Sequence, residues 1–263
     1  MASIWRRPGV LLGGAALYAG VSFATYVTLY DPQKSGANAA APRVDDARRL
    51  QVFDANATQY DREVDWDERL TGISLMRRFL LRRARGRVLE VAAGTGRNLT
   101  FYPPDAHVVL TDFSRGMLDQ VPTTQRLQVA SCELRVMRAD ELAFADGQFD
   151  TVVDTFGLCS MDDSTRALRE MQRVCKKDGG RILLLEHGRS SYAWLSGLLD
   201  KFADLHAQKW GCHWNRDILA LVEQAGLEVE TVQRFHFGTT YYIVAKPGRG
   251  AADEEEEKET EEN

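Results

Sequence analysis

The stretch EVAAGTGRN, residues 90–98, overlaps the end of the short apolar run Arg87–Val91 (RVLEV) and decides the fold of this 263-residue chain. A strand that runs directly into glycines and then into a helix is typical of the first βα unit of a nucleotide-binding sheet. Gly94 and Gly96 let the backbone turn tightly and approach a ligand closely. A dinucleotide fingerprint, however, needs a third glycine at the position of Leu99. The stretch therefore predicts a ligand-binding loop and argues against an NAD site.

The rest of the central region alternates between strand-like and helix-like patterns. Residues 164–176 carry apolar side chains at helical spacing and end at Asp178-Gly179-Gly180, which suits a glycine C-cap. Residues 227–235 and 241–245 predict an antiparallel hairpin at the sheet edge. Further strand-like runs occupy residues 107–111, 134–137, 149–155 and 181–186. Strands separated by helices imply parallel βαβ units, so we predict an α/β fold with a doubly wound, mostly parallel sheet of about seven strands.

Two carboxylates follow neighbouring strands of this predicted sheet. Glu90 would repel phosphates but can accept hydrogen bonds from an amino-acid ammonium group, which favours S-adenosylmethionine (SAM) over NAD. Asp112 lies 16 residues after Gly96, where a carboxylate can accept both ribose hydroxyls. Phe113 and Met117 can then cover the adenine. The alternative for Asp112 is a purely structural role as an acid at the start of a helix.

Several stretches of the chain resemble the class I SAM-dependent methyltransferases, and most closely their UbiE-like branch. They are residues 88–96, 112–118 (DFSRGML), 149–153 (FDTVV) and 173–180 (RVCKKDGG). Residues 94–103, 153–160, 184–190 and 214–217 resemble a membrane-anchored subgroup of this family. The subgroup includes small-molecule thiol methyltransferases and mitochondrial inner-membrane proteins. The resemblance covers residues 86–246. It implies a Rossmann-like methyltransferase fold, SAM as the cofactor and methyl transfer as the reaction.

The same resemblance implies which residues hold the cofactor. They are Glu90, Ala92, Gly94, Gly96, Asp112, Phe113, Met117, Asp140, Glu141 and Thr155. The chain departs from the family pattern at two places, because Ala92 replaces the first glycine of the loop and Arg138 stands where the family has its adenine-contacting acid. Arginine has no acceptor for the amine of adenine. We therefore assign that role to Asp140, two residues later.

The acceptor end of the site is less well defined. In-line methyl transfer from a sulfonium needs alignment, a dry pocket and sometimes a base, but no metal ion. His187, at the end of the fifth strand, titrates near neutrality and is our candidate base; the alternative is a hydrogen-bonded histidine in the pocket wall. His213 is expected to be structural. The four cysteines form no CxxC pair, so we predict reduced, packed cysteines and no metal site.

The two ends of the chain differ in composition from its centre. Residues 9–30 have no charged side chain and are long enough to cross a membrane, which predicts a single-pass anchor within residues 1–30; a cleaved signal peptide is the alternative. Its moderate hydrophobicity suits the mitochondrial inner membrane, with the endoplasmic reticulum as the alternative. Residues 31–47 are predicted to form a linker, residues 48–246 the methyltransferase domain and residues 247–263 a disordered acidic tail.

Charge and amphipathic pattern suggest the partners. Residues 253–263 carry a net charge of −7, so the rest of the chain is nearly neutral and nucleic acid is not an expected partner. The tail is a solubility segment or binds a basic protein. Six arginines at residues 77–87 form a solvated helix face or bind anionic lipid or RNA phosphates. Residues 192–210 predict an amphipathic helix that packs over the site, or a lid that contacts the membrane or admits a lipophilic acceptor.

These observations lead to one main hypothesis and one rival. The main hypothesis is a membrane-anchored, SAM-dependent methyltransferase that acts on a small, lipophilic acceptor of the quinone, thiol or lipid type. The rival is a methyltransferase-like fold without catalysis that serves as an assembly or interaction factor of the mitochondrial inner membrane. Arg138 and the acidic tail suggest the rival.

Overall fold

The computed structural model describes residues 45–248 of the chain. The predicted anchor, most of the predicted linker and nearly all of the acidic tail lie outside these residues. Within the described part, no helix is both long and apolar enough to cross a membrane. The first helix, α2 (Asp46–Thr71), begins two residues before the predicted start of the domain, and the side chain of Asp45 caps it by accepting a hydrogen bond from the backbone N–H of Arg48.

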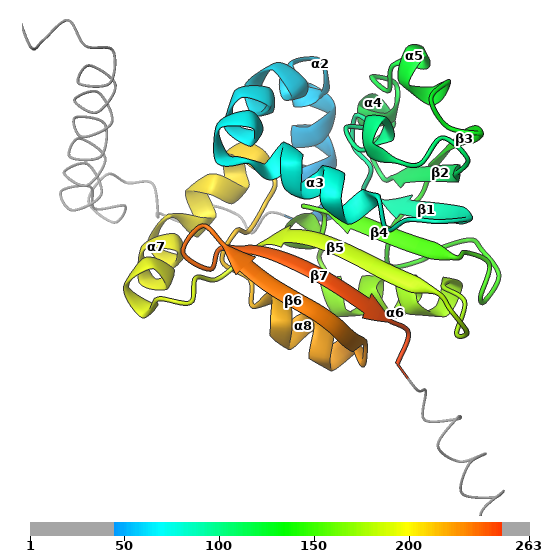
Figure 1. The fold of residues 1–263 in the computed structure, drawn as a ribbon. Coiled ribbons are helices and arrows are strands. Elements are labelled where there is room, and N and C mark those ends of the chain that lie inside the picture. The colour runs from blue at the N-terminus through cyan, green and yellow to red at the C-terminus, as the bar shows by residue number, and fades with distance from the viewer. Residues whose placement is uncertain (1–44, 249–263) are drawn as a thin grey trace, which may run out of the picture. The chain divides into compact units, whose positions relative to one another are not determined.

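Seven strands form one sheet, as the sequence predicts. They are β1 (Arg87–Val91), β2 (His107–Asp112), β3 (Ser131–Val136), β4 (Thr151–Thr155), β5 (Arg181–His187), β6 (Glu228–Phe235) and β7 (Thr240–Lys246). Their order is β3-β2-β1-β4-β5-β7-β6 (Figure 1). Strands β1 to β5 are parallel, and β7 pairs antiparallel with both β5 and β6. The predicted mostly parallel sheet and its edge hairpin are therefore confirmed.

The strand order reverses between β1 and β4. The chain moves outward from β1 through β2 to β3, returns to the other side of β1 with β4, and continues outward to β5. In open parallel sheets, ligands bind outside the carboxyl ends of the strands at such a switch point. The fold therefore places the residues that follow β1, β2 and β4 around one crevice.

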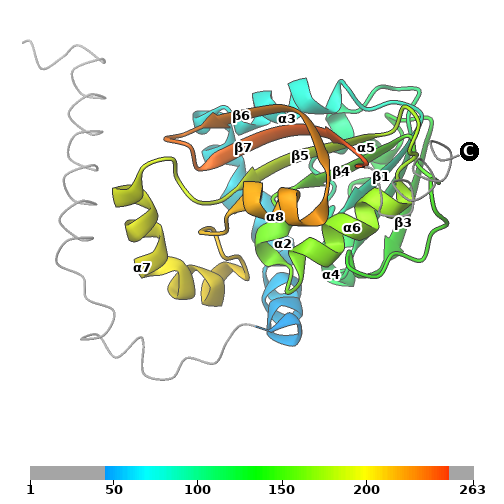
Figure 2. The same cartoon turned by 90° about the horizontal axis from the view of Figure 1, so that it is seen from below.

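Helices cover both faces of the sheet. They are α3 (Ile73–Leu81), α4 (Arg115–Leu118), α5 (Thr123–Arg126), α6 (Ser164–Val174), α7 (Ala193–Trp210) and α8 (Ile218–Ala225), with short 3-10 turns η2 (Leu99–Phe101) and η3 (Leu158–Ser160). One apolar core joins α6 and α8 to the sheet, and the other joins α3 and the region of α4 to its opposite face. Figure 2 shows α6 and α8 side by side in front of the sheet, with α3 behind it. The sheet is thus doubly wound.

Two helices lie beyond the carboxyl ends of the strands. Helix α2 contacts α4, α7 and α3, and Gly72 joins α2 to α3 in the left-handed conformation at φ +80°. Helix α7 confirms the helix predicted at residues 192–210. Of these two helices, α2 contributes side chains to the cavity described below, and α7 contributes none.

Candidate active site

A cavity lies at the carboxyl ends of the central strands. It encloses about 900 Å³ of empty space including its open mouth. Strand ends and the loops after them supply most of its lining, and α2 and Arg77 of α3 contribute to the rest. The lining includes Glu90, Ala92, Gly94, Asp112, Phe113, Met117, Asp140, Thr155 and Phe156, together with Asp46, Phe53 and Tyr60 from α2.

The carboxylate of Asp112 faces this cavity at the end of β2. Its Oδ2 accepts a hydrogen bond from the backbone N–H of Gly94 at 2.8 Å, and its Oδ1 accepts one from that of Ser114 at 2.8 Å. Each oxygen therefore keeps acceptor capacity for a ligand. Burial raises the pKa of Asp112 to about 6, although these backbone hydrogen bonds favour its charged form. The geometry is that of a carboxylate prepared to accept two hydroxyl groups.

Glu90 contributes a second buried carboxylate at the end of β1. Its Oε1 accepts a hydrogen bond from Asn98 at 2.9 Å, and its Oε2 accepts one from the hydroxyl of Tyr102 at 2.6 Å. Burial raises the pKa of Glu90 to about 7, and these two hydrogen bonds oppose the rise. A cation beside Glu90 would favour its charged form. The site is therefore suited to a ligand that carries an ammonium or sulfonium group.

Two residues in the loops around the cavity have left-handed backbone conformations that are rare for residues with a side chain. Ala92 and Phe156 adopt left-handed conformations, at φ +48° and +61°, which cost a residue with a side chain ~1–2 kcal/mol. Gly157 must lack a side chain, because a Cβ there would lie 2.7 Å from Cβ of Ala92. Gly96, at φ +77°, makes the turn but does not line the cavity. Strain concentrated in the lining is typical of a functional site.

Aromatic and sulfur-containing side chains make the cavity largely apolar. Phe53 from α2 meets Phe113 edge to face, with ring centroids 5.9 Å apart. Met117 is buried and approaches Gly94, where a Cβ would lie 3.3 Å from its methyl carbon. Phe113 and Met117 thus lie beside Asp112, as the sequence suggested. Phe53 could not have been placed there from sequence, because α2 folds back from outside the βα pattern.

The segment after β3 differs from the expectation in part. Asp140 lines the cavity, but its carboxylate accepts two hydrogen bonds from the guanidinium of Arg138, both at 2.8 Å. Arg138 also pairs with Asp46 at the start of α2. These hydrogen bonds lower the pKa of Asp140. Glu141 is exposed and is not among the lining residues. The structure therefore places Asp140 at the site and Glu141 outside it.

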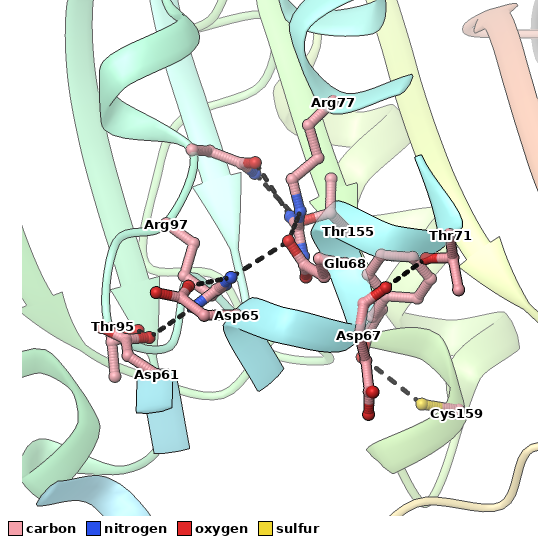
Figure 3. A network of polar contacts seen from close by, with 12 residues as sticks. Asp61, Asp65, Asp67, Glu68, Thr71, Arg77, Thr95, Arg97, Thr155 and Cys159 are labelled. Carbon is pink, nitrogen blue, oxygen red and sulfur yellow. Dashed lines mark hydrogen bonds and ion pairs between the residues drawn. The ribbon is translucent and has the colours of Figure 1, made fainter. Parts of the chain in front are cut away.

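Arg77 joins the cavity wall to α2, as Figure 3 shows. The side chain is only 5% exposed and forms an ion pair with Glu68, 2.7 Å from Nη2 to Oε1. It also donates hydrogen bonds to Asn98 at 2.9 Å and to the hydroxyl of Thr155 at 2.7 Å. Burial disfavours the charge on Glu68, but the arginines beside it outweigh burial and lower its pKa. The sequence suggested that the six arginines of residues 77–87 form a solvated helix face or bind anionic phosphates, and neither holds for Arg77, which is buried and paired with Glu68.

A second set of polar contacts holds α2 against the glycine loop. Arg97 forms ion pairs with Asp61 at 2.9 Å and with Asp65 at 2.8 Å (Figure 3). Thr95 donates to Asp61 at 2.6 Å, and Ser114 donates to Asp54 at 2.5 Å. Asp54, Asp61, Asp65 and Glu68 of α2 follow one another at intervals of seven, four and three residues, which places them on one helix face. This spacing was the signal in the sequence that could have indicated a polar contact surface.

His187 lies apart from the cavity lining. Its Nε2 is 3.0 Å from Sγ of Cys159 and 2.8 Å from Sγ of Cys212. The ring of Phe156, which does line the cavity, packs against the imidazole with centroids 5.2 Å apart. The structure thus places His187 behind the wall rather than in contact with an acceptor. The grouping of these two cysteines and His187 was not predicted, because His187 is 28 residues from Cys159 and 25 residues from Cys212 in sequence.

The fold and this site define a class of protein. Residues 88–179 match the family model described as a methyltransferase domain. A carboxylate after the second strand, a second carboxylate after the first, and an apolar crevice at the switch point fit SAM, which has a ribose diol and two cationic groups. The chain therefore contains a methyltransferase domain, and SAM is the cofactor that this domain implies.

Three curated proteins illustrate this relationship. "Methyltransferase OMS1, mitochondrial" of Saccharomyces cerevisiae is 32% identical over 74% of this chain and 45% of its own length. The ubiquinone/menaquinone biosynthesis C-methyltransferase UbiE of Hahella chejuensis is 37% identical over 58% of this chain and 64% of its own. The human thiol S-methyltransferase TMT1A is 30% identical over 60% and 66%. The chain thus spans about half to two thirds of the curated relatives it matches.

Solved structures share the fold. A SAM-dependent methyltransferase from Thermotoga maritima superposes with a TM-score of 0.58 at 20% identity, covering 76% of this chain and 99% of that one. DhpI, solved in complex with SAH, gives a TM-score of 0.56 at 20% identity, covering 78% and 97%. At these identities the likeness shows the common architecture, which agrees with the strand order described above.

Proposed function

We propose that this protein transfers the methyl group of SAM to a small, lipophilic acceptor of the quinone, thiol or lipid type. The observation that carries the proposal is the carboxylate of Asp112, which faces the cavity with one backbone hydrogen bond on each oxygen. A side chain that served only to cap a helix would not need both oxygens at the edge of a ligand-sized cavity.

The residues present fit the cofactor. Asp112 would accept hydrogen bonds from both ribose hydroxyls, and Phe113 with Met117 would cover the adenine. Glu90 would stabilise the cationic amino-acid end through its buried charge. When bound, SAM would supply a methyl carbon on a sulfonium: the nucleophilic atom of the acceptor would form the new bond, the electrons of the broken C–S bond would stay on sulfur, and any proton on the accepting atom would be released to solvent. The chain's own contribution is to align the reactants and exclude water.

The lining supports an apolar acceptor. Phe53, Met137, Phe156 and Met161 line the cavity together with the cofactor-binding residues. A flat or chain-like apolar molecule would bury surface against these side chains, which stabilises binding by ~25 cal/mol per Å² of apolar area. Acceptors named for the relatives, a ubiquinone or menaquinone precursor for UbiE and a thiol for TMT1A, are of this small-molecule kind.

A membrane setting in the mitochondrion is part of the proposal. The yeast relative is named as mitochondrial, and residues 9–30 remain our candidate for a membrane anchor. On the described surface, Tyr192 and Phe237 have rings 6.4 Å apart and are 52% and 70% exposed, with Trp194 nearby in sequence at 66%. Exposed aromatic rings of this kind suit the interface between water and lipid.

The binding of SAM tests the enzymatic proposal directly. Two hydrogen bonds to a charged group contribute ~1.5–3 kcal/mol each. We therefore expect Asp112→Ala to weaken SAM binding by about 100-fold or more in isothermal titration calorimetry. Asp105→Ala is the matched control, because Asp105 is exposed and outside the cavity. A folded wild-type chain that binds neither SAM nor its demethylated product would refute the proposal.

The non-catalytic rival makes a different prediction. Gly94 lines the cavity at φ +56°, beside Met117, so that Gly94→Arg would obstruct the cofactor. If the protein acts only as an assembly factor, this variant would still rescue a strain that lacks the protein, provided that it accumulates to normal levels. We expect no rescue, and we expect labelled methyl groups from methionine to be missing from a small metabolite in that strain.

A further inference from the structure

Two thiols and an imidazole converge behind the wall of the cavity. The ligand atoms of Cys159, His187 and Cys212 all lie within 4.8 Å of one another. Cys159 and Cys212 are buried, at 1% and 6% exposure. Cys159 lies in the 3-10 turn η3 after β4, His187 at the end of β5, and Cys212 in the loop between α7 and α8. Three segments remote in sequence thus point their donor atoms at one place.

Hydrogen bonding alone does not account for this arrangement. The Nε2 atom of His187 is 3.0 Å from one sulfur and 2.8 Å from the other. An imidazole nitrogen has either one proton or one lone pair, so it can satisfy only one of these contacts at a time. A metal ion between the three atoms would accept a lone pair from each. We propose that Cys159, His187 and Cys212 bind a Zn²⁺ ion.

The donor set is specific for this kind of ion. Cysteine thiolates and neutral imidazole are ligands for Zn²⁺, and Cys₂His with a fourth position for water or another small ligand is a known zinc site. Zn–S and Zn–N distances of ~2.3 and ~2.0 Å in tetrahedral geometry place sulfur and nitrogen about 3.6 Å apart. The two N···S contacts would therefore lengthen by about 0.6–0.8 Å, a small movement for loop residues.

The surroundings contain two buried acids, besides Arg216, whose guanidinium interacts electrostatically with both cysteines. Asp154 and Glu186 are 0% exposed, and within the described residues neither carboxylate accepts a hydrogen bond of normal geometry. Both carboxylates interact electrostatically with Cys159. Uncompensated buried carboxylates are costly. A divalent cation bound by the neighbouring thiols would offset this concentration of acidic groups, which is an observation independent of the three ligands.

The proposed ion would fix the wall of the cavity rather than contact the cofactor. Ser160 and Met161, which follow Cys159 directly, line the cavity, and so does Phe156, whose ring packs on His187. The backbone N–H of His213 donates to the carbonyl of Cys159 at 2.9 Å, which already holds the two cysteine segments together. The three ligands are positioning residues in this interpretation, and none of them lines the cavity.

Metal analysis of the full chain tests the proposal. The protein is produced in zinc-supplemented medium, purified in detergent under reducing conditions without chelator, and analysed by plasma mass spectrometry. We expect about one Zn²⁺ per chain for wild type. We expect a loss of at least about tenfold for Cys212→Ser and for His187→Ala, each of which removes one ligand. Cys132→Ser is the matched control, because Cys132 lies on β3 outside the cluster.

A second measurement keeps the test valid if a ligand variant fails to fold. Wild-type protein is stripped with a strong chelator and then titrated with Zn²⁺ or Co²⁺ alone. We expect Zn²⁺ to restore the melting temperature, and Co²⁺ to give the thiolate charge-transfer and d–d absorption of a tetrahedral site. Wild type without zinc after reconstitution, a Cys159–Cys212 disulfide in the protein as isolated, or full zinc content in both ligand variants would overturn the proposal. None of these readouts depends on SAM or on methyl transfer.

Discussion

Replacing Arg77 by methionine should be among the most damaging single changes in the described fold. The guanidinium is 95% removed from solvent and connects three elements: it pairs with Glu68 of α2, and it donates to Asn98 and to Thr155. Methionine fills similar volume but restores none of these contacts. Glu68 would then keep only its contact with Arg97, at 3.1 Å, inside a region with little access to water.

The magnitude follows from the burial of both charges. The side chains of Arg77 and Glu68 are 5% and 6% exposed, and removing one member of such a pair leaves a buried charge that costs ~3–5 kcal/mol. For a domain of this size, 1 kcal/mol corresponds to a shift of ~2–4 °C in melting temperature. We therefore expect Arg77→Met to lower the melting temperature by roughly 6–20 °C. Arg78→Met, at the exposed neighbouring position, should change it by much less.

The double variant separates the pair from its surroundings. Glu68→Gln together with Arg77→Met removes both charges, so its cost should be smaller than the sum of the two single variants. The pH dependence has a definite sign. Because Arg77 and Arg97 lower the pKa of Glu68, the stability that the pair contributes is fully present above the usual carboxyl range and is lost as the pH falls through the lowered value.

Urea unfolding followed by circular dichroism and tryptophan fluorescence measures these effects, and SAM titration provides a second readout. Thr155 lines the cavity and accepts a hydrogen bond from Arg77, so weaker SAM binding should accompany the loss of stability. A cost below about 1 kcal/mol for Arg77→Met, which is the usual range of an exposed pair, would show that the pair is not buried in solution and that α2 is not fixed in this way.

Three further predictions concern the cavity itself. SAM affinity should be constant at alkaline pH and fall in two steps, because burial raises the pKa of Glu90 to about 7 and that of Asp112 to about 6, and the charged carboxylates bind the cationic end and the two hydroxyls. Calorimetry across the pH range would contradict this if the Asp112→Asn variant kept the wild-type fall in affinity below about pH 6. Tyr102→Phe removes the donor to Glu90 at 2.6 Å and should cost ~1–3 kcal/mol in urea unfolding; an unchanged midpoint would show that Glu90 finds another donor. Gly157→Ala would place a Cβ 2.2 and 2.7 Å from neighbouring side-chain atoms and should lower the free energy of unfolding by ~1–3 kcal/mol. Gly197→Ala, with nothing within 4 Å of the new Cβ, should instead stabilise helix α7 by ~0.5–1 kcal/mol. Equal melting temperatures for the two variants would contradict this packing.

Most of the sheet was predictable from sequence because β1, β2, β4, β5 and β7 are buried on both faces. Such strands read as short apolar runs bounded by glycine or aspartate, and β1, β2, β5 and the β6–β7 hairpin all lie within a residue or two of the predicted ranges. The position of Asp112 and Glu90 follows from the same fact, since parallel strands bring their carboxyl ends to one edge. Periodicity and the strand-end rule together thus predicted the central part of the site.

Helix α2 was not predictable in the same way. Its face toward the domain carries Asp54, Asp61, Asp65 and Glu68, which contact arginines and hydroxyl groups of the loops, and only a few buried apolar residues such as Val52 and Ala57. A periodicity of hydrophobic residues cannot reveal a helix whose packing is polar. The convergence of Cys159, His187 and Cys212 was hidden for a related reason. It depends on the return of the chain through α7, and no local spacing records this.

The departure at Arg138 bears on how adenine is recognised. Arg138 donates two hydrogen bonds to the carboxylate of Asp140 and lowers the pKa of that carboxylate. The carboxylate therefore remains charged, and it keeps lone pairs that the guanidinium does not use. Arg138 is 45% exposed and also pairs with Asp46 at the start of α2. An acid that is held in place by an arginine can still accept a hydrogen bond from an amine, and the same arginine fixes α2 over the cavity. The replacement of the family's usual acid therefore does not by itself argue against catalysis, because Asp140 retains the acceptor that adenine requires and lines the cavity.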